Sequence, residues 1–300
     1  MYTKSKLLLL ISFFISISCS CVFAKDESDT TDKSDFQWFS AISLIAEVNE
    51  QFQLDSVGNQ TSEFDDSYSI NWELHLEWKG FFYEQPGISQ QRIDGQFSGK
   101  AAGYRFYSSP HWDAEALVVE GLLEVGFGVS SATESLQFVR KQDLRAGIRA
   151  NGFYDNYFFQ FIWTPHSFED EIGGNQISAS IRRDWQIKNL NLYATAGVVY
   201  LSDDILSFYF DISSDLSADI LRVLDSDPEN AIPDSTFAPF NASSGLVYSS
   251  QVGVEYPITE HWVLGGVASY QRLPSSIADS PLGFSENDRS AFALSISYVF

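Results

Sequence analysis

The chain has 300 residues with 40 acidic and 18 basic side chains, a formal net charge of −22, and 15% aromatic residues. So acidic a protein is not expected to bind nucleic acid nonspecifically, because contacts to phosphates require lysine and arginine. Beyond residue 24, the sequence has no uninterrupted apolar stretch of the length that a membrane helix requires.

Residues 1–24 have the layout of a secretory signal peptide. Lys4 and Lys6 precede the apolar run LLLLISFFISIS, and small side chains before and at Ala24 suit cleavage after that residue. The apolar run is too short to span a bilayer as a helix. Removal of this segment would take away two lysines and no acid, which leaves a mature net charge of −24.

Both cysteines of the chain, Cys19 and Cys21, lie inside the predicted signal peptide. The mature chain would therefore have no disulfide and no cysteine metal site. Residues 25–35 (KDESDTTDKSD) are too polar to pack and are predicted to form a flexible acidic tail. The remaining residues, 36–300, are predicted to form one domain.

Long alternation of apolar and polar side chains begins after the tail. In YSINWELHLEW, one face carries only apolar or aromatic side chains, namely Tyr68, Ile70, Trp72, Leu74, Leu76 and Trp78. Aromatic residues near both ends of such a strand are typical of a lipid-facing strand of an outer-membrane barrel. Strands of soluble β-sandwiches, the alternative, are usually shorter.

In DLRAGIRA, Arg145 and Arg149 share one face of a strand, which suits a polar lumen better than a dry core. Ion pairs between these inward arginines and Glu73 and Glu77 could close the lumen. About twelve such segments follow one another. They lie near residues 36–48, 68–82, 98–108, 113–129, 134–150, 155–165, 175–185, 189–201, 205–212, 245–257, 261–273 and 289–300.

The pattern predicts an all-β fold, an antiparallel transmembrane β-barrel of about twelve strands, with ten as the alternative. Such barrels keep both termini in the periplasm, which orients the connections. Residues 274–288 and 213–244 then become outer loops, and residues 258–261 become a tight inner turn. Residues 202–205 and 165–174 are also predicted to be inner turns.

The last ten residues, AFALSISYVF, place an apolar side chain at every second position up to the terminal aromatic ring. This pattern resembles the signal by which the barrel-assembly machinery of the outer membrane recognises its substrates. A final strand with unpaired backbone groups can bind by strand addition. The predicted assembly signal consists of Phe292, Leu294, Ile296, Tyr298 and Phe300.

The C-terminal third also resembles a known family of outer-membrane proteins, the MipA/OmpV family. The family pattern is a tyrosine-proline strand end, a W-x-L strand, an R-L pair and a D-S-P turn. The matching residues here are Tyr256, Pro257, Trp262, Leu264, Arg272, Leu273, Asp279, Ser280 and Pro281. The resemblance is specific over roughly the last hundred residues.

The resemblance implies a scaffold in the outer membrane, because the family's named member links a lytic transglycosylase to a bifunctional penicillin-binding protein. A narrow channel for small solutes is the alternative that the architecture suggests. The family carries no established catalytic residues, so none are assigned here. Outer-membrane lipid and lipopolysaccharide are the other expected partners.

Motifs for other chemistry are weak. The histidines past the signal peptide, His75, His111, His166 and His261, are scattered without the spacing of a zinc site, and no nucleophile elbow occurs. We therefore expect no enzymatic activity, cofactor or resident metal. Acidic residues do crowd one predicted outer loop, where calcium or magnesium could bridge to lipopolysaccharide; a solvated loop without an ion is the alternative. They are Asp225, Asp227, Glu229 and Asp234.

Overall fold

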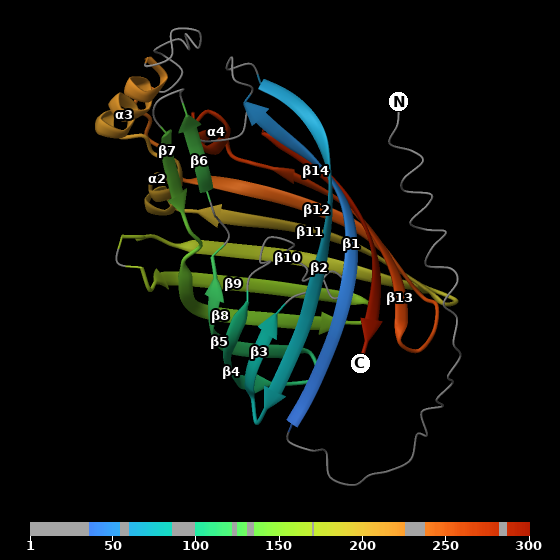
Figure 1. Cartoon of the computed structure of the whole chain (residues 1–300). Coiled ribbons are helices and arrows are strands. Elements are labelled where there is room, and N and C mark those ends of the chain that lie inside the picture. Colours follow the sequence, from blue (N-terminus) through green and yellow to red (C-terminus); the bar gives the residue numbers. More distant parts are fainter. Residues whose placement is uncertain are drawn as a thin grey trace, which may run out of the picture.

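The computed structural model describes residues 36–54, 60–85, 100–121, 125–130, 135–169, 171–225, 238–281 and 287–300. The predicted signal peptide (1–24) and acidic tail (25–35) lie outside the described residues. Twelve antiparallel strands form a closed barrel, in the order β1-β14-β13-β12-β11-β10-β9-β8-β5-β4-β3-β2 (Figure 1). The predicted fold class and strand number are confirmed.

The barrel strands follow chain order, and each pairs with the next barrel strand, so that β5 pairs with β8 across the β6–β7 hairpin. β1 and β14 close the barrel, with Ala41 opposite Val299 and Asn49 opposite Ala291. The strands are β1 (Phe36–Leu54), β2 (Gln60–Trp78), β3 (Phe81–Gln85), β4 (Ala101–Ser108), β5 (Trp112–Glu120), β8 (Leu144–Tyr154), β9 (Tyr157–Ser167), β10 (Gln176–Ile187), β11 (Leu190–Leu201), β12 (Gly245–Pro257), β13 (Trp262–Arg272) and β14 (Asp288–Val299).

The two ends of the barrel differ. One end, the turn end, carries the first residue of β1, the last residue of β14 and only short connections. These connections are Lys79–Gly80, residues 109–111, Asp155–Asn156, Lys188–Asn189 and residues 258–261. Bacterial barrels have short turns and both termini in the periplasm. We therefore infer that the turn end is the periplasmic end.

The opposite end, the loop end, carries the long connections. These contain a separate hairpin, β6 (Val125–Ser130) with β7 (Ser135–Arg140), and three helices, α2 (Asp203–Phe210), α3 (Ser214–Asp225) and α4 (Ser275–Ala278). Figure 1 shows them gathered on the same side of the barrel, away from the β12–β13 turn. The described parts of residues 213–244 and 274–288, namely 213–225, 238–244, 274–281 and 287–288, lie at this end, as predicted for outer loops. Among the described residues, no helix is long and apolar enough to cross a membrane.

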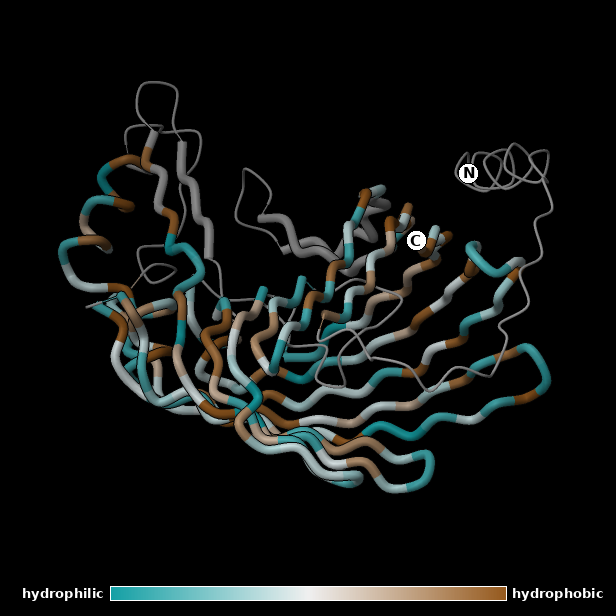
Figure 2. Tube along the Cα trace, turned by 90° about the horizontal axis from the view of Figure 1, so that it is seen from below, coloured by the Kyte–Doolittle hydropathy of each residue, from teal (hydrophilic) through white to brown (hydrophobic). Residues whose placement is uncertain are grey.

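Side chains alternate between lumen and outer surface along each strand, which follows from the pleat. Figure 2 shows hydrophobic and hydrophilic residues alternating along the strands. The outer surface exposes many large apolar side chains, which suits contact with lipid acyl chains. They include Phe36, Trp38, Ile70, Trp72, Trp112, Ile148, Phe161, Trp163, Ile181, Leu246, Val252, Leu264 and Phe292.

Several predicted segment bounds are wrong. Residues 205–212, predicted as a strand, lie mostly in helix α2. Residues 68–82, predicted as one strand, contain the end of β2, a tight turn and the start of β3. Residues 113–129 and 134–150 each combine part of a barrel strand with part of the β6–β7 hairpin.

These errors also reverse two predicted connections. Residues 202–205 begin α2 at the loop end, and are not an inner turn. Residues 165–174 end β9 and continue into the β9–β10 connection, which also lies at the loop end. The reason is that counting helix α2 as a membrane strand inverts the predicted direction of the strands between residues 98 and 201.

Candidate functional site

A buried ion-pair network covers one wall of the lumen. Its centre is Arg149 on β8, whose guanidinium donates to both carboxylate oxygens of Glu84 on β3, at 2.9 Å each, and to Glu115 on β5. The Arg149 and Glu115 side chains are only 4% and 1% exposed. A buried charge is tolerable only when it is paired and hydrogen-bonded, and this geometry meets that requirement.

A second arginine extends the network toward β2. Arg105 on β4 donates to Glu115 at 3.1 Å and to Glu77 at 2.9 Å. His75 lies 3.7 Å from carboxylate oxygens of both Glu77 and Glu84. Side chains from five strands are thereby joined. We call this set the lumen network, and its members are His75, Glu77, Glu84, Arg105, Glu115 and Arg149.

The lumen network reinforces the part of the barrel where backbone pairing is shortest. β3 pairs with β4 only from Phe81 to Glu84, and with β2 only from Phe81 to Gln85. The Arg149–Glu84 pair crosses β4 and β5 to hold β3 from the lumen side. These charged groups therefore stabilise the barrel wall, where they form hydrogen bonds with one another.

The hypothesis about the two β8 arginines is correct for their direction and wrong for their partners. Both face the lumen, but Arg149 binds Glu84 and Glu115. Arg145 donates to Asp143 at 2.7 Å and to the carbonyl oxygen of Gly174 at 2.6 Å.

Helix α2 packs into the loop end of the barrel and forms a mouth cap. Its residues Leu206, Tyr209 and Phe210 are at most 1% exposed. They pack in one core with lumen-facing residues of β11 and β12 and with residues of three loops: Ile172, Val199, Leu201, Ala242, Val247, Leu273 and Ile277. Burial of so many apolar side chains holds the helix against the mouth.

Polar contacts tie the mouth cap to two other loops. The Tyr209 hydroxyl donates to the carbonyl oxygen of Lys141 at 3.0 Å, and Ser280 donates to the carbonyl oxygen of Phe210 at 2.8 Å. Arg140 donates to the carbonyl oxygen of Asp211 at 3.1 Å. Burial raises the pKa of the Tyr209 phenol, and the nearby Asp143 carboxylate adds to that shift. The neutral phenol is therefore the form that fits this site.

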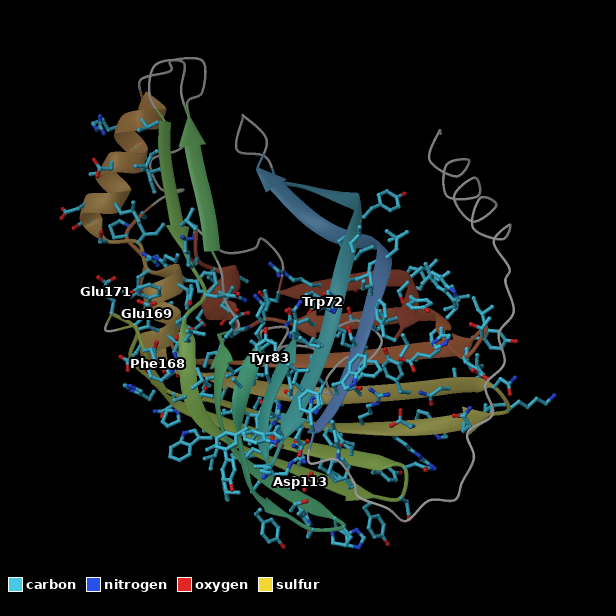
Figure 3. The ribbon with its side chains drawn as sticks, turned by 60° about the horizontal axis from the view of Figure 1, so that its bottom comes forward. Trp72, Tyr83, Asp113, Phe168, Glu169 and Glu171 are labelled. Carbon is cyan, nitrogen blue, oxygen red and sulfur yellow. The ribbon has the colours of Figure 1, made fainter. Side chains whose placement is uncertain are left out.

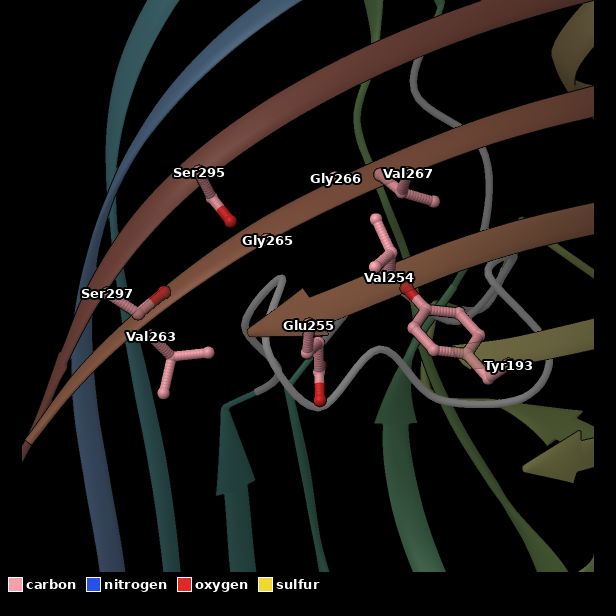
Figure 4. A pocket seen from close by; sticks show the side chains of 9 residues that line it. All are labelled: Tyr193, Val254, Glu255, Val263, Gly265, Gly266, Val267, Ser295 and Ser297. Atoms are coloured by element: carbon pink, nitrogen blue, oxygen red, sulfur yellow. The ribbon is translucent and has the colours of Figure 1, made fainter. Parts of the chain in front are cut away.

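A small concavity lies on the opposite wall of the lumen, nearer the turn end (Figure 4). Its volume is only about 10 Å³, and it is lined by Tyr193, Val254, Glu255, Val263, Gly265, Gly266, Val267, Ser295 and Ser297. Glu255 accepts a hydrogen bond from Asn191 at 3.2 Å, and the Arg182 guanidinium lies 4.2 Å from the Tyr193 ring centre. The wall here combines Glu255 and two serines with the Tyr193 ring and three valines.

The predicted assembly-signal residues lie together on the outer face of β14. Phe292 and Phe300 are exposed, and Tyr298 contacts the rings of His261, Trp262 and Phe300. The backbone N–H of Phe300 donates to the carbonyl oxygen of Ser40 on β1 at 3.1 Å. The remaining two, Leu294 and Ile296, share this face by alternation. Their role in assembly stays a prediction.

The family-motif residues divide between the two ends of the barrel. Tyr256, Pro257, Trp262 and Leu264 surround the β12–β13 turn at the turn end. The others lie at the loop end: Arg272 ends β13, Leu273 is in the core of the mouth cap, Asp279 and Ser280 follow α4, and Pro281 comes next. They form no single site.

Sequence reasoning missed Glu84, Glu115, Asp143 and Tyr209. Glu115 could have been found, because it alternates with apolar residues in WDAEALVVE just as Arg149 does on β8.

Figure 3 shows Asp113 near the turn end and Glu169 and Glu171 at the loop end. Within the described residues, no three His, Cys, Asp or Glu side chains are grouped to hold a metal. Of the predicted acidic loop, residues 226–237 lie outside that part of the chain.

Comparison with known proteins identifies the family. A family model described as "MltA-interacting protein MipA" matches residues 57–300. The "Putative outer membrane protein YiaT" of Escherichia coli (strain K12) is 29% identical over 121 residues, which cover 40% of this chain and 43% of that protein. The aligned part is thus less than half of the curated relative's length.

Solved outer-membrane proteins share low sequence identity with this chain. OprB of Pseudomonas putida matches with a TM-score of 0.40 and 7% identity, covering 88% of this chain and 94% of that one. The COG4313 outer membrane channel from Pseudomonas putida F1 matches with a TM-score of 0.39 and 10% identity, covering 92% and 100%. The family match spans most of the barrel, and this chain belongs to the MipA family of outer-membrane proteins.

Proposed function

We propose that this barrel is a non-enzymatic scaffold that holds peptidoglycan synthesis and remodelling enzymes at the outer membrane. The observation that carries the proposal is the match of residues 57–300 to a family described as MltA-interacting. A lytic transglycosylase is the partner that this description suggests, and a penicillin-binding protein is the second partner that the family resemblance implies.

The mouth cap favours the scaffold function rather than a wide channel. Its packed core at the loop end involves residues from β11 to α4, including Val199, Leu206 and Ile277. A helix seated in the mouth reduces the open cross-section, and a twelve-strand barrel is already narrower than the open porins. The lumen network adds rigidity, which suits a fixed membrane anchor.

A partner that acts on peptidoglycan must reach the turn end, because that end faces the periplasm. Exposed side chains there include Ile258 in the β12–β13 turn, together with the aromatic residues Trp78, Trp112 and Tyr154. Aromatic side chains are frequent anchors of protein interfaces. The same residues also suit the membrane interface, so binding must be tested by substitution within a turn.

Binding of purified, reconstituted barrel to a lytic transglycosylase and to a bifunctional penicillin-binding protein tests the scaffold. Ile258→Asp changes an exposed apolar residue at the turn end, and Phe168→Asp changes a comparably exposed one at the loop end. We expect Ile258→Asp to weaken binding by about tenfold, since a central apolar contact contributes this much, and Phe168→Asp to leave it unchanged. Equal effects, or no binding by the parent protein, would refute the scaffold.

The second candidate is a narrow channel for small solutes, and the polar lumen wall favours it. The lumen network on one wall and Glu255 in the concavity on the other place charged groups in the lumen. A solute would have to pass the mouth cap. Conductance measurements distinguish the two functions.

A further inference from the structure

One arginine faces away from the lumen on the barrel wall near the turn end. The lumen-facing positions of β10 are Gln176, Ser178, Ser180 and Arg182, so its neighbour Arg183 points outward. Arg182 is satisfied inside the barrel by Asp184, at 2.7 Å. The outward Arg183 has a different environment.

Two aromatic rings hold the Arg183 guanidinium. Its central carbon lies 5.0 Å from the Tyr157 ring centre and 5.1 Å from that of Trp185. Tyr157 is further stacked against Phe159, with 6.3 Å between ring centres. Contacts to ring faces orient the cation but use none of its five N–H donors. In the part of the chain that the structure describes, no carboxylate forms an ion pair with Arg183.

Arg183 lies at the depth of the membrane interface. It is directly opposite Tyr157, the first residue after the Asp155–Asn156 turn. Trp185 lies one outward position closer to the turn end, and tryptophan and tyrosine mark the headgroup level of a bilayer. The outward arginine at the other end of the barrel, Arg272, has a carboxylate, Asp288, at 3.9 Å.

We propose that Arg183, Tyr157 and Trp185 form a binding site for the phosphate of a phospholipid in the periplasmic leaflet. The planar guanidinium can donate two parallel hydrogen bonds to phosphate oxygens. The two rings flank the headgroup, and the outer apolar surface of β9 and β10 receives the acyl chains. This site is separate from the proposed scaffold function and does not depend on it.

Native mass spectrometry of the purified mature barrel tests the site with dioleoyl phosphatidylglycerol as the probe. Arg183→Gln is expected to reduce retained lipid by about tenfold, because it removes the paired charge-assisted hydrogen bonds to the phosphate. Lys188→Gln, which removes the same charge in the next turn, is the matched control and should change retention less than twofold. Arg183→Lys keeps the charge without the planar fork and should fall between the parent and Arg183→Gln.

Two further probes separate the possible sources of phosphate. Dioleoylglycerol has the same chains without a phosphate and is expected to be retained equally by the parent and by Arg183→Gln. Inorganic phosphate at the lipid concentration should not displace the phospholipid. Equal retention of phosphatidylglycerol by the parent and Arg183→Gln, or displacement by free phosphate, would overturn the assignment. Heat-modifiable migration on gels verifies that each variant is folded.

Discussion

At the scale of single residues, the outer and inner faces of this barrel impose opposite chemistry on adjacent positions. Leu74 lies on the outer face of β2, and His75 lies on the inner face between Glu77 and Glu84. Lipid cannot solvate a charge, whereas the lumen supplies carboxylates for one. The same substitution at both positions therefore has different expected costs.

Leu74→Arg is expected to reduce the free energy of unfolding by about 2–4 kcal/mol if the residue lies near the bilayer midplane. His75→Arg should be mild, because a guanidinium there reaches two carboxylates. Urea unfolding in lipid vesicles, followed by tryptophan fluorescence, measures both. Similar losses for the two variants would mean that β2 is not inserted in this orientation.

Arg149→Leu should lower the free energy of unfolding by far more than the change in side-chain size suggests. It leaves Glu84 and Glu115 without their shared guanidinium, and removal of one member of a buried pair costs about 3–5 kcal/mol. Arg182→Leu is the control, because Arg182 and Asp184 are more exposed, at 17% and 37%. Comparable unfolding free energies for the two variants would contradict the structural role of the lumen network.

The side of β8 on which Arg145 and Arg149 lie could be predicted from the sequence, but the carboxylates that they bind could not. Alternation alone places Arg145 and Arg149 on one side of β8, and this is confirmed. Which carboxylate each meets depends on strand order and register, and on the hairpin that separates β5 from β8. Glu84 was missed because it lies two residues beyond the end of the predicted strand 68–82, on the five-residue strand β3 whose start was merged with β2.

At the scale of elements, α2 shows how a short apolar segment can be misread. Residues 205–212 have dense apolar and aromatic side chains, as a strand would. The buried residues of α2 are Ile205, Leu206, Tyr209 and Phe210, which recur with helical spacing. Asp203 and Asp204 occupy the first turn, where acidic side chains favour the helix dipole.

The mouth cap should loosen at alkaline pH through Tyr209. Its pKa in the folded protein is raised above the ordinary value of 10.0 by burial. Stability from the neutral phenol is therefore complete below the ordinary pKa and is lost as pH rises through the raised one. Tyrosinate absorbance of Tyr209→Phe should show one late-titrating phenol fewer than that of the parent protein. Identical titration curves would show that this phenol is not buried.

Deletion of Phe300 tests the closing strand β14 as an assembly signal. The ring is exposed on the outer face, and its N–H makes one backbone hydrogen bond to Ser40. Its loss should barely change the stability of folded barrel, but should slow insertion and leave protein in the periplasm. Cell fractionation after a pulse of synthesis measures this. Normal kinetics and yield for the truncated protein would rule out the signal.

At the scale of the whole molecule, the strand number was predicted correctly through two compensating errors. The sequence pattern added residues 205–212 as a strand and merged β2 with β3. The first two and the last three predicted strands therefore have the correct direction, but the predicted strands between residues 98 and 201 have the wrong one. A two-residue turn at Lys79–Gly80, with φ of 51° and 86°, is a weak sequence signal, and so this division was missed.

The lumen network braces one wall of the barrel, and the mouth cap packs against β11 and β12 at the loop end. Such a molecule suits an anchor with a binding surface at the periplasmic end. The proposed scaffold, unlike the proposed channel, would not require solutes to pass the packed apolar residues of the mouth cap, such as Leu206 and Phe210.

Single-channel recording of the mature protein in a planar bilayer tests this account most directly. The parent protein is expected to give no steady open-channel current. Phe210→Asp places a charge in the core of the mouth cap and should release α2, which exposes the polar lumen and produces a small current. A steady current from the parent protein, unchanged in Phe210→Asp, would contradict the closed scaffold and favour the channel.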